Sequence, residues 1–175
     1  VLHPVDDPVA LEKEAVSLAS ETGAKNAMRV KAEFDVIRSQ LEEMAHLQVF
    51  ETGTDAEKAA VMAEVKKLMP AANTMAWLNP DGYGVSSTGA YIDRSDREYV
   101  KKVRENRSLY QTEPIIAKTT GKLSTIIVQP VLSNGKTSGM IFAALALDSV
   151  SKISSDIKML LTGYGYIVDE AGLAV

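Results

Sequence analysis

The sequence predicts an α+β domain in which a long N-terminal helix packs on an antiparallel sheet of about five strands with flanking helices. Three observations lead to this fold class. Between Pro8 and Phe50 the only helix-breaking residue is Gly23. After residue 70, segments rich in β-branched residues are separated by tight-turn signals. The strands come in a group of two and a group of three with one helix between them, which is typical of α+β folds rather than of alternating β and α units.

The long helix is expected to begin at Asp7 and to extend to about Phe50. Asp7 is a good N-cap residue, and Pro8 fits the first helical position, where its missing N–H costs nothing. A single internal glycine costs only about 1 kcal/mol relative to alanine. Thr22-Gly23 therefore leaves two alternatives open, one continuous helix or two pieces joined by a break or kink.

The second half of this helix carries an apolar seam whose spacing of 4, 3, 4, 3 and 3 residues is close to a heptad stripe. Two interpretations fit the seam. It packs on the sheet of its own chain, or part of it pairs with a second copy to form a parallel homodimer, and both can hold along different lengths of one helix. The residues of the seam are Val30, Phe34, Ile37, Leu41, Met44 and Leu47.

A second helix is expected from about Asp55 to Met69. Thr54-x-x-Glu57 has the pattern of a capping box, in which each residue satisfies an unpaired backbone N–H at the start of the helix. Pro70 ends the helix. A hairpin then follows, with strands over 73–78 and 83–88 joined by a tight turn at 79–82, which reads Asn-Pro-Asp-Gly.

The next part of the chain is expected to hold one helix and three neighbouring strands. Ser95-x-x-Glu98 reads as a second capping box and opens a helix to about Asn106. Asn134-Gly135 is the favoured residue pair of a two-residue hairpin turn. Short connections make consecutive strands neighbours in the sheet. The three expected strands span 113–117, 123–132 and 138–147.

Composition narrows the class of function. The net charge is −4, without a basic stripe, which argues against binding of nucleic acid. The chain has no cysteine and two distant histidines, so no metal site and no cofactor is expected. No phosphate-binding loop, nucleophile elbow or zinc-protease motif is present, and we expect no enzymatic activity. No run of about 18 apolar residues occurs, so any membrane anchor of the parent protein is expected to lie outside this sequence.

Arg97 is the first candidate binding residue. The capping box would place it in the first turn of a helix, where the helix dipole favours acidic residues instead. Either an ion pair with Asp93, Asp96 or Glu98 favours it there, or its guanidinium fork binds the carboxylate of a small ligand. Helical spacing would turn Tyr99 away from Arg97.

Aromatic residues recur in the same half of the chain, and a mostly apolar pocket with a few convergent polar groups is the usual site for a small ligand. Trp77, the single tryptophan, is either part of such a pocket or part of the core. The full set of candidate ligand-binding residues is Arg97, Tyr99, Trp77, Tyr91, Ser87, Tyr110 and Lys118.

Several short patterns follow one another in a fixed order between residues 79 and 153. They are N-P-D-G, S-D-R-E-Y, E-P-x-I-x-K-x-T-G-K, Q-P-V, and N-G-K-x-x-G before a long apolar strand. In this order they resemble a Cache sensor domain, the PAS-like extracytoplasmic module of chemoreceptors, sensor histidine kinases and diguanylate cyclases. The final segment, GYGYIVDEAGLAV, resembles the opening of the second module of a double Cache domain.

The resemblance implies a PAS-like sheet with a ligand pocket between the sheet and the short helix. Members that bind amino acids carry Arg-x-Trp-Tyr on that helix and an aspartate on a strand. Here Arg97 is kept, while Tyr99 and Val100 replace the Trp and the Tyr. The strand position of the aspartate falls near Ala144. The resemblance therefore favours a small carboxylate or an uncharged ligand over an amino acid, and it also allows no ligand at all.

The resemblance also implies a domain order. A helical segment at 1–70 would precede a membrane-distal sensor module at 71–162, and 163–175 would begin a truncated second module. Within this frame, Asp148 is expected to cap a helix to about Leu161.

The hypothesis is an extracytoplasmic sensor, in the periplasm or at the cell exterior, that binds a small molecule and passes a conformational change along the long helix of a homodimer. Two other classes remain open. One is a dimerisation or interaction module that binds no small ligand. The other is a cytosolic PAS-like domain that holds haem or flavin.

Overall fold

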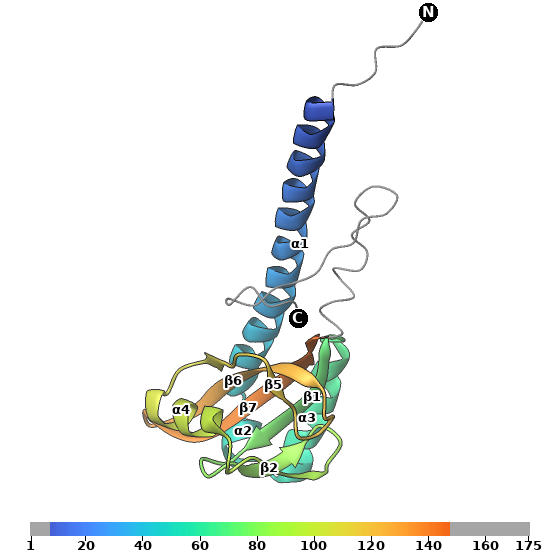
Figure 1. The fold of residues 1–175 in the computed structure, drawn as a ribbon. Helices are drawn as coiled ribbons and strands as arrows, with labels where there is room; N and C mark the ends of the chain where they lie inside the picture. Colours follow the sequence, from blue (N-terminus) through green and yellow to red (C-terminus); the bar gives the residue numbers. More distant parts are fainter. Residues whose placement is uncertain (1–7, 148–175) are drawn as a thin grey trace, which may run out of the picture. The chain divides into compact units, whose positions relative to one another are not determined.

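The computed structural model describes residues 8–147 (Figure 1). Helix α1 runs over Pro8–Ala45 and continues through Thr22-Gly23, so the alternative of two helical pieces is wrong. It ends five residues before the predicted Phe50. The chain then turns at Leu47, whose backbone is extended at φ −75° and ψ 129°, and starts the short helix α2, Gln48–Thr52. This turn places Phe50 in the core with 0% exposure.

Helix α3, Asp55–Lys67, begins at the predicted capping box. The backbone N–H of Glu57 donates to the Thr54 hydroxyl over 3.3 Å. In return, the backbone N–H of Thr54 donates to the Glu57 carboxylate over 2.8 Å. These hydrogen bonds lower the pKa of Glu57, the backbone bond with Thr54 contributing most. Because both halves of the box lie within four residues, the sequence alone was enough to predict this helix start.

The sheet has seven strands, two more than the predicted number of about five. The order is β3-β2-β1-β7-β6-β4, and β5 pairs with β6. The two unpredicted strands, β3 and β4, are three and two residues long, too short to show an alternating pattern. The strands are β1 Ala72–Leu78, β2 Tyr83–Ser86, β3 Tyr91–Asp93, β4 Tyr110–Gln111, β5 Ile115–Ile116, β6 Leu123–Ser133 and β7 Lys136–Ala146.

The two predicted hairpin turns are present. Asn134 and Gly135 have φ of 51° and 72°, and they join β6 to β7 with Ser133 opposite Lys136. Positive φ at both positions is the geometry that favours Asn-Gly. At the other turn, the backbone N–H of Gly82 donates to the Asn79 carbonyl over 3.0 Å, and the Asn79 side chain accepts from the N–H groups of Asp81 and Tyr83.

Side chains alternate between two faces of the sheet, and each face has its own core. One face packs against α1, α2 and α3, where Ile37, Leu41 and Phe50 meet Met75 and Ile141. The other packs against α4, Glu98–Asn106, where Tyr99, Val100 and Val103 meet Ile126, Phe142 and Ala144. Figure 1 shows α4 across the sheet from α2 and α3. Strand β7 therefore contributes alternate residues to both cores.

The apolar seam of α1 packs largely within its own chain. Ile37, Leu41 and Met44 are buried against the sheet, at 1%, 0% and 2% exposure. Leu47 lies beyond the end of α1 and is 45% exposed. For residues 37–44, the seam therefore packs on the sheet of its own chain, which is one of the two interpretations of the sequence.

The described residues fall into two units that divide within α1, one of them over residues 33–147 and the other over residues 8–32. The first unit joins the second half of α1, α2 and α3 to the sheet. In the second unit the structure describes α1 from Pro8 onward. The helix predicted after Asp148 and the segment 163–175 lie outside the described residues, and the predicted domain order stays a prediction.

Gly84 generates a prediction about stability. A Cβ at this position in β2 would lie 1.9 Å from the backbone carbonyl oxygen of Trp77. Backbone atoms of two paired strands cannot move aside as a flexible side chain can. Gly84→Ala is therefore expected to destabilise the folded state by about 1–3 kcal/mol or more. Thermal unfolding followed by circular dichroism should show a Tm lower by about 2–4 °C per kcal/mol.

The matched control is Gly23→Ala, at a helical glycine with nothing within 4 Å of the added Cβ. Alanine is the better helix former, so this variant should unfold no earlier than wild type. A Gly84→Ala variant that melts with wild type would contradict the packing described for β1 and β2.

Candidate ligand-binding site

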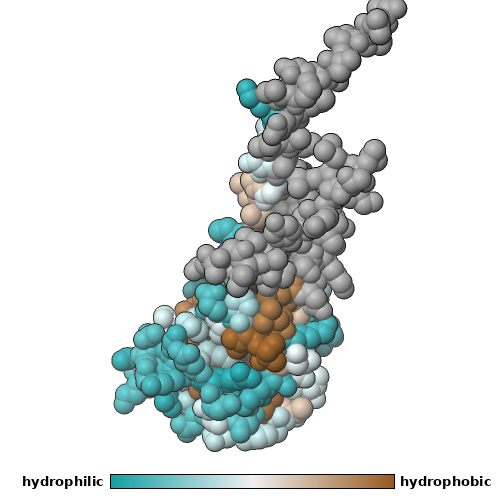
Figure 2. All heavy atoms as spheres, viewed as in Figure 1, coloured by the Kyte–Doolittle hydropathy of each residue, from teal (hydrophilic) through white to brown (hydrophobic). Residues whose placement is uncertain are grey.

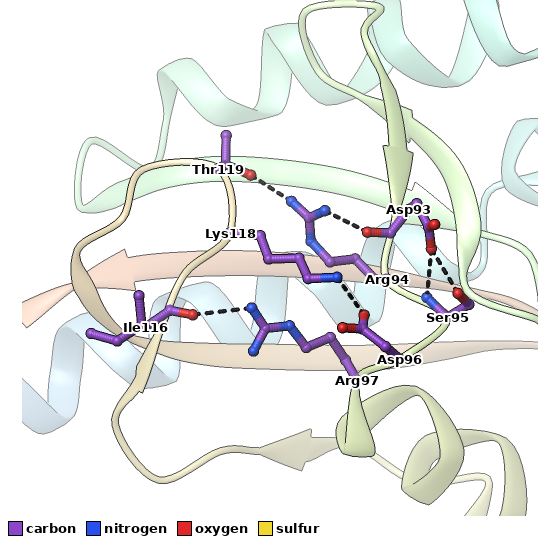
Figure 3. A network of polar contacts seen from close by, with 8 residues as sticks. All are labelled: Asp93, Arg94, Ser95, Asp96, Arg97, Ile116, Lys118 and Thr119. Carbon is purple, nitrogen blue, oxygen red and sulfur yellow. Dashed lines mark hydrogen bonds and ion pairs between the residues drawn. The ribbon is translucent and has the colours of Figure 1, made fainter.

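The site is built on the turn between β3 and α4, shown in close-up in Figure 3. The Asp93 carboxylate accepts two hydrogen bonds from Ser95, one from the backbone N–H over 2.9 Å and one from the hydroxyl over 2.7 Å. These bonds lower the pKa of Asp93, the backbone bond being the larger cause. The turn also rests on the preceding hairpin, because the N–H of Arg94 donates to the Gly82 carbonyl.

This geometry corrects the prediction of a capping box at Ser95. Helix α4 begins at Glu98, its N-cap is Arg97, and no side chain caps it. The Ser95 hydroxyl is already committed to Asp93, two residues earlier, so it is not available to the helix. Arg97 is therefore not in the first helical turn, and its backbone is extended, with φ −89° and ψ 130°.

The prediction that Tyr99 turns away from Arg97 is wrong for the same reason. Helical spacing applies only to residues inside the helix, and Arg97 lies outside it. Both side chains line one small hollow, which we call the Arg97 hollow. None of the predicted ion pairs of Arg97 with Asp93, Asp96 or Glu98 is among the salt bridges of the described residues. Asp96 pairs with Lys118, and Glu98 pairs with Lys102.

Three polar contacts tie the turn to the segment 116–119 (Figure 3). Arg94 Nη2 donates to the Thr119 hydroxyl over 2.6 Å. Arg97 Nη2 donates to the Ile116 carbonyl over 3.2 Å. Lys118 Nζ donates to the Asp96 carboxylate over 2.5 Å, and this bond lowers the pKa of Asp96. The segment therefore forms one wall of the Arg97 hollow.

The Arg97 hollow is cationic at its walls and apolar at its base. Arg94, Arg97 and Lys118 line it, and none of its lining residues is acidic. Its base is formed by Ile126, Phe142 and Ala144, from β6 and β7. The cavity volume is about 10 Å³, about the space of one water molecule. In this state the hollow is closed around its own polar contacts.

A larger hollow adjoins it, which we call the β2–β3 hollow. It has a volume of about 540 Å³, and Ser87 and Tyr91, both predicted site residues, line it. Arg94 and Thr119 line both hollows and so form the wall between them. In the space-filling view, hydrophilic residues cover the surface around α4 (Figure 2).

Tyr110 lies in a third hollow, which shares Arg97 and Tyr99 with the first. Its hydroxyl accepts a hydrogen bond of 3.0 Å from Lys102. This bond is the main cause of a raised pKa of Lys102, and the ammonium lies 4.9 Å from the centre of the Tyr110 ring.

Trp77 is the predicted residue that the structure does not bring to the site. It faces the helical core, on the opposite side of the sheet from Tyr99. The Lys58 ammonium lies 3.6 Å from the centre of its ring, and desolvation lowers the pKa of Lys58. The indole N–H is buried without a partner in the described residues, and a Cβ on Gly139 would lie 2.7 Å from that nitrogen. Trp77 is a core residue, one of the two alternatives left open by the sequence.

Sequence reasoning missed Arg94 and Thr119. Arg94 is only 9% exposed, and it bonds both the Asp93 carbonyl and Thr119. The sequence feature that could have indicated Arg94 is a pair of arginines three residues apart beside a turn, Arg94 and Arg97. Thr119 gave no signal, because its role depends on a contact across 25 residues.

No helix within residues 8–147 is long and apolar enough to cross a bilayer. In the same range no three histidine or acidic side chains gather in a way that could hold a metal ion.

The long helix, the antiparallel sheet and a hollow between the sheet and a short helix together define a PAS-like sensor fold. Comparison with known proteins agrees with this class. A family model described as "Cache domain" matches residues 10–175. Over 83 residues, 47% of this chain, the sequence is 34% identical to methyl-accepting chemotaxis protein PscA of Pseudomonas syringae pv. tomato, and the match spans 13% of that protein's length.

Solved structures of similar fold include two chemoreceptor ligand-binding domains. That of CtaA from Pseudomonas fluorescens, in complex with L-isoleucine, has a TM-score of 0.75 at 19% identity over 98% of this chain and 71% of that chain. That of PctC from Pseudomonas aeruginosa, in complex with GABA, has a TM-score of 0.72 at 19% identity over 90% of this chain and 72% of that chain. The chain belongs to the Cache domain family, and the sensor-domain class predicted from the sequence is confirmed.

Tyr99 generates a prediction about pH. Burial raises its pKa to about 12, against the opposing effect of Arg94 and Arg97. An unfolded tyrosine ionises near pH 10. Between about pH 10 and 12 the unfolded chain loses this proton while the folded chain keeps it, so stability falls as pH rises through that window, by about 2–3 kcal/mol in total.

Urea unfolding at a series of pH values from 9 to 12 should show a smaller loss of stability in Tyr99→Phe than in wild type. Tyr91→Phe, at a side chain that is 72% exposed, is the matched control and should keep the wild-type slope. Parallel slopes for wild type and Tyr99→Phe would contradict the burial of this hydroxyl.

Proposed function

We propose that this chain is the extracytoplasmic ligand-binding part of a transmembrane signalling receptor, and that it binds a small carboxylate against Arg97. The observation that carries the proposal is the charge of the Arg97 hollow, which three cations and no acid line. Similarity to a methyl-accepting chemotaxis protein supports the receptor assignment. The ligands in the similar CtaA and PctC structures, L-isoleucine and GABA, both carry a carboxylate.

The amine of an amino-acid ligand has no matching acid in this hollow. Ala144 lies at the base of the hollow and is 3% exposed. It stands at the strand position where the family resemblance predicts an aspartate. An ammonium group placed beside Arg94, Arg97 and Lys118 would meet like charges. The proposal is therefore a ligand recognised by its carboxylate, which a guanidinium fork binds through two parallel hydrogen bonds.

Binding would act on the rest of the domain through the sheet. Phe142 and Ala144 of β7 form the base of the hollow, while Ile141 and Ala143 of the same strand pack on the side that holds α1. A carboxylate that replaces the Ile116 carbonyl as the partner of Arg97 would displace segment 116–119. This displacement would change the packing of that segment against β6 and β7. We propose that α1 passes this change toward the membrane as a small displacement.

The test of the site is isothermal titration with a panel of small carboxylates. Arg97→Ala is expected to weaken the binding of each active compound by about 10- to 100-fold, the range of a charge-assisted hydrogen-bond pair. Arg97→Lys, which keeps the charge but not the fork, should recover only part of the loss. Arg104→Ala, at an arginine of α4 that bonds Asp81 and the Pro80 carbonyl, is the control and should bind as wild type.

If every carboxylate fails to bind wild type, or if Arg97→Ala binds them unchanged, the proposed site is wrong. A protein that then still forms a tight dimer would favour the second class, an interaction module without a small ligand.

We further propose that α1 takes part in homodimerisation. Met28 and Val36 are large apolar side chains on this helix that are 71% and 51% exposed. A second copy of α1 would cover them. Sedimentation velocity over a concentration series should show a dimer for wild type and a weaker one for Met28→Lys/Val36→Lys. An equally stable dimer in this double variant would exclude this face of α1 from the interface.

A further inference from the structure

The Arg97 hollow and the β2–β3 hollow lie side by side on one face of the sheet. Thr74, which lines the larger hollow, is paired across β1 and β7 with Ala144, which lines the smaller one. Arg94 and Thr119 line both. A hydrogen bond of 2.6 Å joins these two shared residues, from Arg94 Nη2 to the Thr119 hydroxyl.

The sizes of the two hollows differ sharply, at about 10 Å³ and about 540 Å³. The smaller one has about the space of one water molecule, so it cannot hold the body of a ligand. Small-molecule sites usually measure about 300–1,000 Å³. Two larger hollows adjoin it, the third hollow through Arg97 and Tyr99 and the β2–β3 hollow through Arg94 and Thr119. Only the β2–β3 hollow shares Arg94, so a ligand whose carboxylate bonds Arg94 would extend into that hollow.

The lining of the larger hollow indicates the chemistry of that part of the ligand. Thr74 is 7% exposed and lines this hollow. Its hydroxyl is not among the buried side-chain atoms of the described residues that lack a partner, so it keeps accessible surface. A hydroxyl in such a hollow bonds to water or to a ligand, and a ligand group that displaces the water must replace its hydrogen bonds or lose affinity. Ser87 and Tyr91 bring two further hydroxyls to the same lining, which also includes the charged side chains of Lys66 and Asp93. An alkyl chain would leave these groups unpaired, whereas ligand hydroxyls would pair with them as donors and acceptors.

From this arrangement, and building on the carboxylate site proposed above, we infer that the ligand is a hydroxylated carboxylate such as a sugar acid. Its carboxylate contacts Arg94 and Arg97, and its hydroxyl groups occupy the β2–β3 hollow beside Thr74. The carboxylate replaces the Thr119 hydroxyl as acceptor for Arg94 Nη2, a charge-assisted bond in place of a neutral one. Thr119 is exposed, so water satisfies its hydroxyl after the exchange.

The experiment is titration calorimetry on the 175-residue chain with ligands matched in carbon number. The probes are D-gluconate, D-glucuronate and D-galacturonate, with hexanoate as the carboxylate without hydroxyls and sorbitol as the polyol without charge. At least one sugar acid is expected to bind about tenfold or more tightly than hexanoate, and sorbitol is expected not to bind.

Thr74→Val removes the hydroxyl while keeping the shape of the side chain. It should weaken sugar-acid binding by about tenfold and leave hexanoate unchanged. Thr120→Val, at an exposed hydroxyl that lines neither hollow, is the matched control. Ser87→Ala gives a second variant of the same hollow in case Thr74→Val lowers the melting temperature.

Different experimental outcomes would contradict the hydroxylated-ligand inference and the carboxylate site. If hexanoate binds through Arg97 as tightly as the sugar acids, or if neither Thr74→Val nor Ser87→Ala changes sugar-acid binding, the hydroxylated class is wrong and the carboxylate site stands. If sorbitol binds as well as the sugar acids, or if no carboxylate binds at all, both proposals are overturned.

Discussion

The turn between β3 and α4 is held by one carboxylate, that of Asp93, which accepts hydrogen bonds from both the backbone N–H and the hydroxyl of Ser95. This arrangement takes Ser95 away from the helix and delays the start of α4 to Glu98. Arg97 then has an extended backbone, and its guanidinium reaches Ile116 while that of Arg94 reaches Thr119. The two arginines converge on one segment because the helix starts late.

The sheet gives this site a direct mechanical connection to the long helix. Residues of β7 alternate between the two faces, so Phe142 and Ala144 touch the site while Ile141 and Ala143 belong to the core shared with α1. Closely packed cores transmit small shifts because they have little free volume to absorb them. In the transmission route that we propose, a change at the base of the Arg97 hollow would reach Ile37 and Leu41 across the sheet, whose two faces β7 joins.

The sequence was sufficient to predict features decided within a few residues. Thr54 and Glu57 cap α3, and Asn134-Gly135 joins β6 to β7, because each signal is complete within its own segment. Ser95-x-x-Glu98 has the same pattern as the first capping box and yet caps nothing, since Asp93 competes for the same hydroxyl. The face occupied by Trp77 depends on its pairing with Ile141, which is 64 residues away along the chain and leaves no local signal.

The contacts that close the Arg97 hollow are of a kind that a ligand can replace at low cost. The Lys118–Asp96 ion pair is solvent-exposed on both sides, and such pairs contribute little to stability. Thr119 offers Arg94 a neutral acceptor, and Ile116 offers Arg97 a single carbonyl at 3.2 Å. A carboxylate is a stronger partner for either guanidinium than the group it would displace. Differential affinity of this kind is what shifts a two-state equilibrium, so the same arginines that hold the segment in place make its position responsive to a ligand.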